Sequence, residues 1–334
     1  MTDRRYKKKN PHLQTQRLCA IINISQQKEV SMKARQNLKG SLILCIASLI
    51  WGVAFVAQST AADKVPSFLF NSLRSFIGSL FLLLLLFVRG RVSKQPIFPS
   101  TKTARKKALL GGFLCGVFLT VAANFQQFGI AYYPSGVATE ARAGFLTALY
   151  VILVPLFSIF VGKLPRINLL LAVGVATAGV YLLCLSDGIG SIYLGDFFLL
   201  CCAVAFTFHI LTVNRFVTDV DGILLSALQF LTCGILSAIL SLIFEDVLWS
   251  NVLAAAPQIL YLGIASSGIA YTLQIIGQKF AEPTVASITM SLESVFAALG
   301  GWVLVGNALS GRELIGCTLV FAAIVLAQIP FQKN

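Results

Sequence analysis

Ten apolar stretches follow one another along this chain, and each approaches the length that an α-helix needs to cross a membrane. A spanning helix needs about 20 mostly apolar residues, because the hydrocarbon core of a bilayer is ~30 Å thick. One such stretch alone would fit a buried helix of a soluble protein, but ten in succession do not. The sequence therefore predicts an all-α integral membrane protein with ten transmembrane helices. We place them at about 40–61, 66–88, 108–132, 135–161, 168–185, 195–215, 222–244, 255–278, 284–304 and 313–329.

The composition agrees with a lipid bilayer as the surrounding medium. Hydrophobic residues make up 57% of the chain and charged residues 12%, whereas a soluble domain carries about 25% charged residues. A net charge of +13 would also suit nucleic acid, but ten of the 26 Lys and Arg lie in the first 39 residues and most of the others lie in short loops. This placement indicates membrane topology, and we expect no nucleic-acid partner.

Loop charges predict the orientation. If the N-terminus is cytoplasmic, the inner loops and the C-terminus hold twelve Lys and Arg, while the outer loops hold two, Lys64 and Arg312. Positive charge is concentrated on the cytoplasmic side of membrane proteins. We therefore expect a multi-pass protein of the cell membrane with both termini cytoplasmic. Residues 1–39 are predicted to form a basic, disordered cytoplasmic segment. They hold no apolar stretch as long as a signal peptide's core.

The ten predicted helices divide into five plus five. Gly40 begins the first helix and Gly195 the sixth, while Pro134 precedes the fourth and Pro283 the ninth. Because five is odd, the second set enters the membrane from the opposite side. The sequence thus predicts two inverted five-helix repeats, at 40–185 and 195–329, with a substrate site near the membrane midplane where the repeats meet.

Two segments carry a resemblance to a known family. The first half opens with LILCIASLIWGVAFVAQ, and the second half closes with LESVFAALGGWVLVGNALSGRELIGCTLVFAAIVLA. Over about 40–328 the chain resembles EamA-type members of the drug/metabolite transporter superfamily. It departs from them at Ser294, where the family often has proline, and at Asn307, where it often has an acid. The resemblance implies a ten-helix secondary carrier with a central cavity, often exporting amino acids or other small metabolites.

Glu293 is a carboxylate in the middle of the stretch 284–304. It lies ten residues after Pro283, or ~15 Å along a helix, which is about half of the hydrocarbon core. An acid at that depth costs about 2.5–3.5 kcal/mol, so it should face a polar cavity or a partner. We expect Glu293 to bind a substrate amine or to exchange a proton. The alternative is a hydrogen bond that ties its helix to a neighbour.

Arg74, Glu140 and Arg142 are also ionisable residues within predicted spans. Counted from the outer ends of their helices they lie at one level, about 9–12 Å deep. Asn71 shares a helix face with Arg74 because it is three residues away. We expect a polar cluster that contacts a charged substrate or gates the outer side. The alternative is a static pair of Arg74 with Glu140.

Neutral polar and aromatic residues of the spans complete the candidate translocation site. His209 is expected to be either a hydrogen-bonded interior residue or a proton relay. Tyr271 and Gln274 lie on one face of their helix. The remaining candidates in this group are Trp51 and Tyr150, as residues of a cavity wall, and Gln126 and Gln229.

Other function classes find less support in the sequence. It shows no nucleophile–base pair, no glycine-rich phosphate loop and no metal-ligand spacing among its eight cysteines, so we expect no enzyme activity, cofactor or metal. The expected partner is a small-molecule substrate. A channel and a non-transporting membrane scaffold or receptor stay open as alternatives, as does the oligomeric state.

Overall fold

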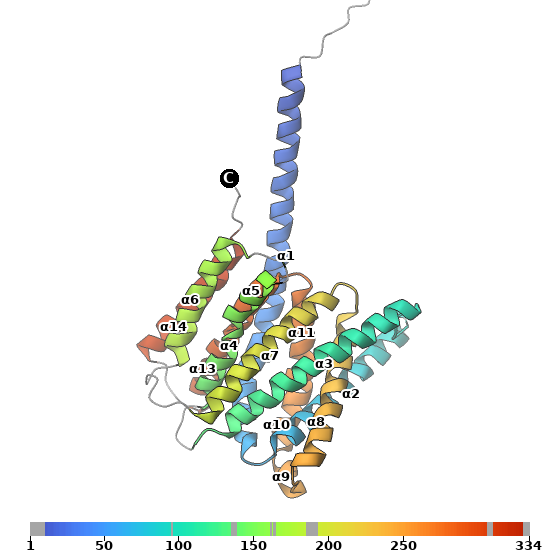
Figure 1. Cartoon of the computed structure of the whole chain (residues 1–334), viewed down its shortest axis with the longest axis vertical. Coiled ribbons are helices and arrows are strands. Elements are labelled where there is room, and N and C mark those ends of the chain that lie inside the picture. The colour runs from blue at the N-terminus through green and yellow to red at the C-terminus, as the bar shows by residue number, and fades with distance from the viewer. Residues whose placement is uncertain are drawn as a thin grey trace, which may run out of the picture.

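The structure is a computed structural model that describes residues 11–94, 96–134, 139–160, 162, 165–184, 193–305 and 310–329. Over these residues the protein consists of helices that pack into one bundle, and no strand occurs among them (Figure 1). The first half holds α1 (Pro11–Ala62), α2 (Ser67–Ser93), α3 (Lys102–Ala131), α4 (Thr139–Ala148), α5 (Tyr150–Phe160) and α6 (Ile167–Cys184).

The second half begins at residue 194. The eighth of the ten predicted spans, at 255–278, is a composite of three helical pieces. It holds α7 (Leu194–Phe216), α8 (Gly222–Phe244), α9 (Trp249–Ala254), α10 (Ala256–Tyr261), the π-helix η1 (Leu262–Ala270), α11 (Tyr271–Gln278), α12 (Pro283–Met290), α13 (Leu292–Val305) and α14 (Gly311–Gln328). The sequence did not predict the short helix α9.

Among the described residues, seven helices are long and apolar enough to cross a membrane. They are Ser31–Ala62, Ser67–Ser93, Lys102–Ala131, Arg142–Phe160, Leu194–Phe216, Gly222–Phe244 and Ala256–Gln278. Two shorter apolar helices lie within α6 and α14. The prediction of an all-α membrane protein is therefore confirmed, while the count of ten spans stays a prediction.

The structure continues α1 through much of the segment that the sequence predicted as disordered. The helix begins at Pro11, a residue type that suits the first turn, and it projects beyond the bundle (Figure 1). Between Pro11 and Lys39 no further proline and no glycine interrupts the chain, and these are the two residue types that most disfavour a helix. Residues 1–10 of the predicted segment lie outside the described residues.

Two of the expected helices are interrupted near their middle. The stretch expected at 135–161 breaks at Leu149, and the stretch expected at 284–304 breaks at Ser291. At each break the chain tightens to hydrogen bonds between residues three apart, as in the 3.0 Å bond from the Ile152 amide to the Leu149 carbonyl. Such tight turns within helices often mark hinges or strained sequence.

Apolar side chains divide between an interior core and an outer surface. Leu119, Val151 and Phe230 are buried in the interior, where α3 meets α7 and α8, and α5 meets α7. Leu80 and Leu242 are among many large apolar residues exposed on the outside. An apolar exterior of this kind suits contact with lipid chains.

Helices α1 and α13 approach each other closely at Gly52. A Cβ atom added to this glycine would lie 2.4 Å from Cβ of Phe296, which is closer than two carbon atoms can pack. Small residues let membrane helices approach closely in this way. Gly52 thereby sets the separation between α1 and α13.

Replacing Gly52 by valine should therefore destabilise the protein by about 1–3 kcal/mol, the usual cost of forcing extra carbon atoms into a packed interior. The measurement is the midpoint of thermal unfolding in detergent. Gly174→Val is the matched control, because a Cβ atom at Gly174 meets no atom within 4 Å. Equal midpoints for the two variants would contradict the close approach.

Candidate functional site

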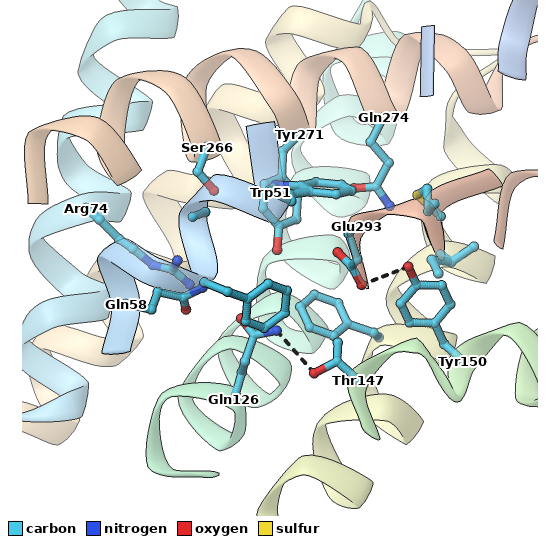
Figure 2. A pocket seen from close by; sticks show the side chains of 15 residues that line it. Trp51, Gln58, Arg74, Gln126, Thr147, Tyr150, Ser266, Tyr271, Gln274 and Glu293 are labelled. Atoms are coloured by element: carbon cyan, nitrogen blue, oxygen red, sulfur yellow. Dashed lines mark hydrogen bonds between the residues drawn. The ribbon is translucent and has the colours of Figure 1, made fainter. Parts of the chain in front are cut away.

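A cavity lies where the two halves of the chain meet (Figure 2). Its walls come from helices of both halves. The first half contributes Trp51, Ala54, Phe55, Gln58, Arg74, Gln126, Thr147 and Tyr150, and the second half contributes Phe206, Ile210, Ser266, Tyr271, Gln274, Met290 and Glu293. Seven of the sequence-predicted site residues are in this lining: Glu293, Arg74, Trp51, Tyr150, Gln126, Tyr271 and Gln274.

Glu293 is held by a partner from the other half of the chain. The Tyr150 hydroxyl donates a hydrogen bond of 3.0 Å to Oε1 of Glu293, and only 6% of the Glu293 surface is exposed. Tyr150 directly follows the interruption at Leu149, and Glu293 lies two residues after the one at Ser291. Each interruption thus lies one or two residues before a residue that joins the two halves at the cavity.

Arg74 reaches the same cavity from α2. It is 4% exposed, and among the described residues it has no ion-pair partner, while its Nε atom has no hydrogen-bond acceptor. The nearest ring is that of Phe70, whose centroid lies 6.0 Å from the guanidinium carbon. A buried, unpaired charge is costly, so the site is suited to an anionic group that the chain itself does not supply.

The two charged residues lie at different sides of the cavity. Figure 2 shows Arg74 and Gln58 at one side, and Glu293 with Tyr150 at the other. Trp51 and Tyr271 lie between them, with ring centroids 4.8 Å apart in an edge-to-face arrangement. A molecule in the cavity would therefore meet opposite charges at its two ends and aromatic rings between them.

Several neutral polar atoms of the lining also lack partners. Nε1 of Trp51, Oε1 of Gln58 and Oε1 of Gln274 are buried without a hydrogen-bond partner among the described residues. Most buried polar atoms in proteins are hydrogen-bonded to protein or to water. One free donor and two free acceptors therefore indicate a cavity built for polar contents.

The remaining walls combine weak polar contacts with apolar side chains. Nε2 of Gln126 lies 3.4 Å from Oγ1 of Thr147, to which it donates. Phe55, Phe206 and Met290 supply apolar surface. Such a mixture of apolar walls and few polar groups is typical of small-molecule sites.

The predicted cluster of Arg74, Glu140 and Arg142 does not form. Glu140 accepts a hydrogen bond from the Ser59 hydroxyl, and Arg142 pairs with Asp196. Neither Glu140 nor Arg142 lines the cavity that Arg74 faces. The alternative interpretation, a static pair of Arg74 with Glu140, is also not found among the described contacts.

The reason is the starting point of α4. The depth estimate counted one continuous helix from Pro134, whereas α4 begins at Thr139. Glu140 and Arg142 therefore lie in the first turn of α4. There they meet the ends of α1 and α7.

Asn71, His209 and Gln229 make contacts between helices outside the cavity lining. Nδ2 of Asn71 donates to Oδ1 of Asn124 at 2.9 Å, and Nε2 of His209 lies 3.0 Å from Oε1 of Gln229. The His209 ring packs edge-to-face against Tyr271. These contacts agree with the interpretation of His209 as a hydrogen-bonded interior residue.

Sequence reasoning missed three polar lining residues: Gln58, Thr147 and Ser266. Gln58 is an amide within the apolar stretch 40–61, and this isolation is the signal that could have identified it. Thr147 and Ser266 carry no comparable signal, because serine and threonine can bond to their own helix and are common in membrane spans.

Ser294, the position where the resemblance led us to expect proline, connects α13 to α4. Its hydroxyl donates to the Gly144 carbonyl at 3.0 Å, a bond that proline has no group to make. Asn307, the second departure, lies outside the described residues.

An apolar helical bundle with a polar cavity between its halves is an architecture that multi-pass membrane transporters have. The model of the EamA-like transporter family matches residues 38–185 and 193–328. The chain belongs to this family, and the resemblance stated from the sequence is confirmed.

Relatives and one solved structure agree with this assignment. The chain is 26% identical over 295 residues to an uncharacterized transporter of Archaeoglobus fulgidus, covering 88% of this chain and 87% of the relative. It is 24% identical over 306 residues to the uncharacterized inner membrane transporter YedA of Escherichia coli K12, covering 89% and 93%. A crystal structure with 24% identity covers 86% of this chain and 96% of its own, with a TM-score of 0.67, which shows a shared fold.

The protein is accordingly a multi-pass membrane transporter with a small-molecule substrate. Its relatives include a transporter of an inner membrane. Membership of a transporter family favours a role other than catalysis.

Proposed function

We propose that this protein is a secondary transporter that exports a small zwitterionic metabolite, such as an amino acid or a related compound, by alternating access. The observation that carries the proposal is the placement of Arg74 and Glu293, two buried and oppositely charged residues, in the walls of one cavity. The proposed location is the cytoplasmic membrane.

A zwitterion would satisfy both charges at once. Its carboxylate would accept parallel hydrogen bonds from the Arg74 guanidinium, the strongest geometry for this pair. Its ammonium group would donate to Glu293, whose Oε1 already accepts a hydrogen bond from Tyr150. The free polar atoms of Trp51 and Gln274 would bond further polar groups of the substrate, and Gln126 and Tyr271 would complete the wall.

We further propose that the fold consists of ten spans in two inverted five-helix repeats. In this scheme α4 with α5, α10 with η1 and α11, and α12 with α13 each form one span. The pattern of helix contacts supports it. α3 packs on α7 and α8, while the counterparts of these helices also pack together, α11 on α1 and η1 on α2.

Two further pairs fit the same exchange of halves. α1 packs on α13 as α7 packs on α4, and the pairs α2–α8 and α6–α14 each join two counterparts. The fourth span of each half is interrupted near its middle. A substrate site between two such halves is the arrangement that alternating access requires.

In this proposal both termini are cytoplasmic. The support is the charge distribution, in which inner loops and the C-terminus hold twelve Lys and Arg against two in the outer loops. Asn71, His209 and Gln229 then hold the helices around the site, and Glu140 and Arg142 lie at the outer end.

The test is flux into liposomes that hold the purified protein. We expect saturable uptake of a labelled amino acid from a panel, accelerated by unlabelled amino acid inside, in experiments with and without a pH gradient. The methyl ester and the N-acetyl derivative of the same amino acid should compete poorly, because each lacks one of the two charges. If both derivatives compete as strongly as the unmodified amino acid, the two-charge site is refuted.

The same experiment separates the alternatives. Flux that does not saturate, together with single-channel conductance, would identify a channel. Absence of flux for the whole panel, with normal protein folding, would favour a scaffold or receptor. Loading from the cytoplasmic side of oriented vesicles tests the direction of transport.

A further inference from the structure

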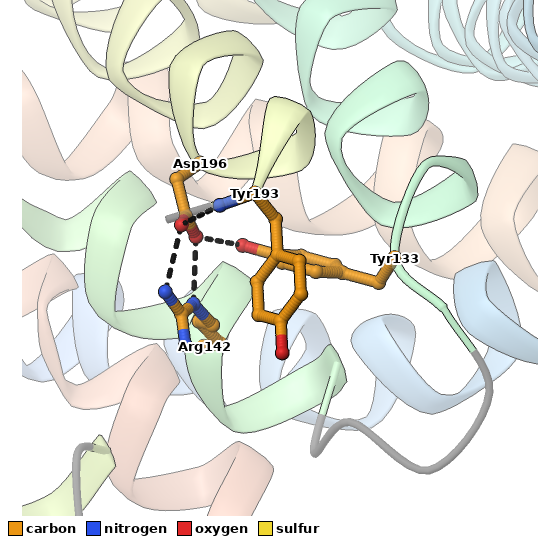
Figure 3. A network of polar contacts seen from close by, with 4 residues as sticks. All are labelled: Tyr133, Arg142, Tyr193 and Asp196. Carbon is orange, nitrogen blue, oxygen red and sulfur yellow. Dashed lines mark hydrogen bonds and ion pairs between the residues drawn. The ribbon is translucent and has the colours of Figure 1, made fainter. Parts of the chain in front are cut away.

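Asp196, near the start of α7, is the centre of a polar network at one end of the bundle (Figure 3). Its Oδ1 accepts hydrogen bonds of 2.6 Å from Nε of Arg142 and of 2.6 Å from the Tyr133 hydroxyl. Its Oδ2 accepts bonds of 2.7 Å from Nη2 of Arg142 and of 2.8 Å from the Tyr193 amide. We call these four residues the Asp196 network.

Aromatic rings enclose the ion pair of this network. The Arg142 guanidinium carbon lies 4.9 Å from the ring centroid of Tyr193 and 5.9 Å from that of Tyr133. Burial and the Asp196 carboxylate raise the pKa of the Tyr133 phenol well above its usual value, so its hydroxyl remains a donor. Only 14% of the Arg142 side chain and 10% of the Asp196 side chain are exposed.

The Asp196 network joins the two halves of the chain. Arg142 belongs to α4 in the first half, and Asp196 belongs to α7 in the second. Beside it, the Ser59 hydroxyl at the end of α1 donates to the Glu140 carboxylate at the start of α4. The start of α4 is therefore held on two sides by polar contacts.

The network lies at the ends of α4 and α7, and the cavity lies further along these helices. Along the chain, Thr147 and Tyr150 of the cavity lining follow Arg142 by about 8 and 12 Å. On α7 the lining residue Phe206 follows Asp196 by about 15 Å. By the charge distribution this end faces outward.

Ion pairs between the halves at the opposite end are more exposed. There Arg166 pairs with Glu282 at 2.9 Å, with 42% and 49% of their side chains exposed. Exposed ion pairs contribute little because water screens them, whereas a bidentate pair removed from water is stronger and more specific. Opening the outer end thus requires the separation of the better-shielded pair.

We propose that the Asp196 network holds the outer side of the cavity closed and separates each time the cavity opens outward. The inference rests on the alternating access proposed above. Asp196, Tyr133 and Tyr193 thereby become functional residues of the transport cycle without contacting the substrate. After separation, Arg142 and Asp196 are in contact with water at the open outer side of the cavity. This hydration limits the free energy that separating the ion pair costs.

The test measures access to the cavity from outside. Thr147→Cys, in a background without the native cysteines, provides a thiol in the lining, and a membrane-impermeant thiol reagent is added outside right-side-out vesicles without substrate. We expect Asp196→Asn and Arg142→Gln each to raise the labelling rate about tenfold, within the range typical of two-state coupling. The double variant should match the single ones, because all remove the same contact.

Two further variants make the result decisive. Tyr133→Phe keeps the ion pair between Arg142 and Asp196 and the hydrogen bond from the Tyr193 amide to Asp196. It should raise the labelling rate by about threefold, and this result can be obtained even if Asp196→Asn does not fold. Glu282→Gln breaks the exposed pair at the opposite end and should leave outside labelling unchanged.

Unchanged or slower labelling in folded Tyr133→Phe and Arg142→Gln would overturn the proposal. Labelling needs no substrate, whereas flux in the same vesicles does. A rise in labelling without flux would therefore refute the zwitterion site and leave outer closure supported.

Discussion

Replacing Glu293 by glutamine is expected to lower the transport of a zwitterionic substrate by about thirtyfold or more while leaving the folded protein intact. The amide has the size of the carboxylate, and its oxygen can still accept the Tyr150 hydrogen bond that measures 3.0 Å. Only the negative charge is lost. Removing one partner from a buried, hydrogen-bonded charge pair costs about 2–5 kcal/mol, and every 1.4 kcal/mol is about a factor of ten in affinity.

Counterflow in liposomes distinguishes the two roles considered for Glu293. If the carboxylate binds the substrate amine, Glu293→Gln loses counterflow together with net uptake. If the carboxylate only carries a proton, the variant keeps counterflow and loses the accumulation driven by a pH gradient. We expect the first result, because Glu293 lines the cavity.

Glu282→Gln is the matched control for Glu293→Gln. Glu282 lies at the helix terminus before Pro283, with 49% of its side chain exposed and Arg166 as its partner. This substitution should leave transport near the wild-type rate. A Glu293→Gln protein that transports at the wild-type rate would remove the carboxylate from the mechanism.

Replacing Arg74 by glutamine is expected to raise KM for the zwitterion about a hundredfold without destabilising the protein. The guanidinium has no ion-pair partner among the described residues, and its side chain is 4% exposed. Loss of its hydrogen bonds to a substrate carboxylate removes the strongest polar contact of that end. Because removing an uncompensated buried charge relieves a desolvation cost, the unfolding midpoint should stay equal or rise.

Two comparisons make the Arg74 prediction specific. Arg74→Lys keeps the charge but not the planar pair of donors, so its KM should fall between those of wild type and Arg74→Gln. In the Arg74→Gln variant the methyl ester should compete with the labelled amino acid as well as the unlabelled amino acid does. The reason is that no group remains to recognise the carboxylate. A large drop in the unfolding midpoint, with unchanged KM, would instead assign Arg74 a structural role.

Much of the cavity could be predicted because membrane helices carry strong local signals. Glu293 and Arg74 are isolated charges in apolar stretches, and a bilayer gives such residues no other low-energy place than an interior site. Tyr271 and Gln274 follow from helical spacing, since residues three apart share a face. These signals depend on the bilayer and on the geometry of a single helix.

The contacts between the helices were beyond this reasoning. Arg142 pairs with Asp196 rather than lying beside Arg74, because α4 starts later than the sequence indicated. Asp196 lies at a helix start, where an acid has the ordinary role of capping the helix, and so it carried no functional signal.

The sequence by itself determined that this protein is a helical membrane transporter of the EamA-like family, and it identified Glu293 and Arg74 as charges of the interior. The physical reason is that a helix in lipid must be apolar at nearly every position and long enough to cross the bilayer, and both properties can be read from the sequence. Only the tertiary structure decided which charges face each other. That choice depends on where each helix begins and breaks, and on close packing such as that of Gly52 against Phe296. Both follow from contacts between residues far apart in the chain.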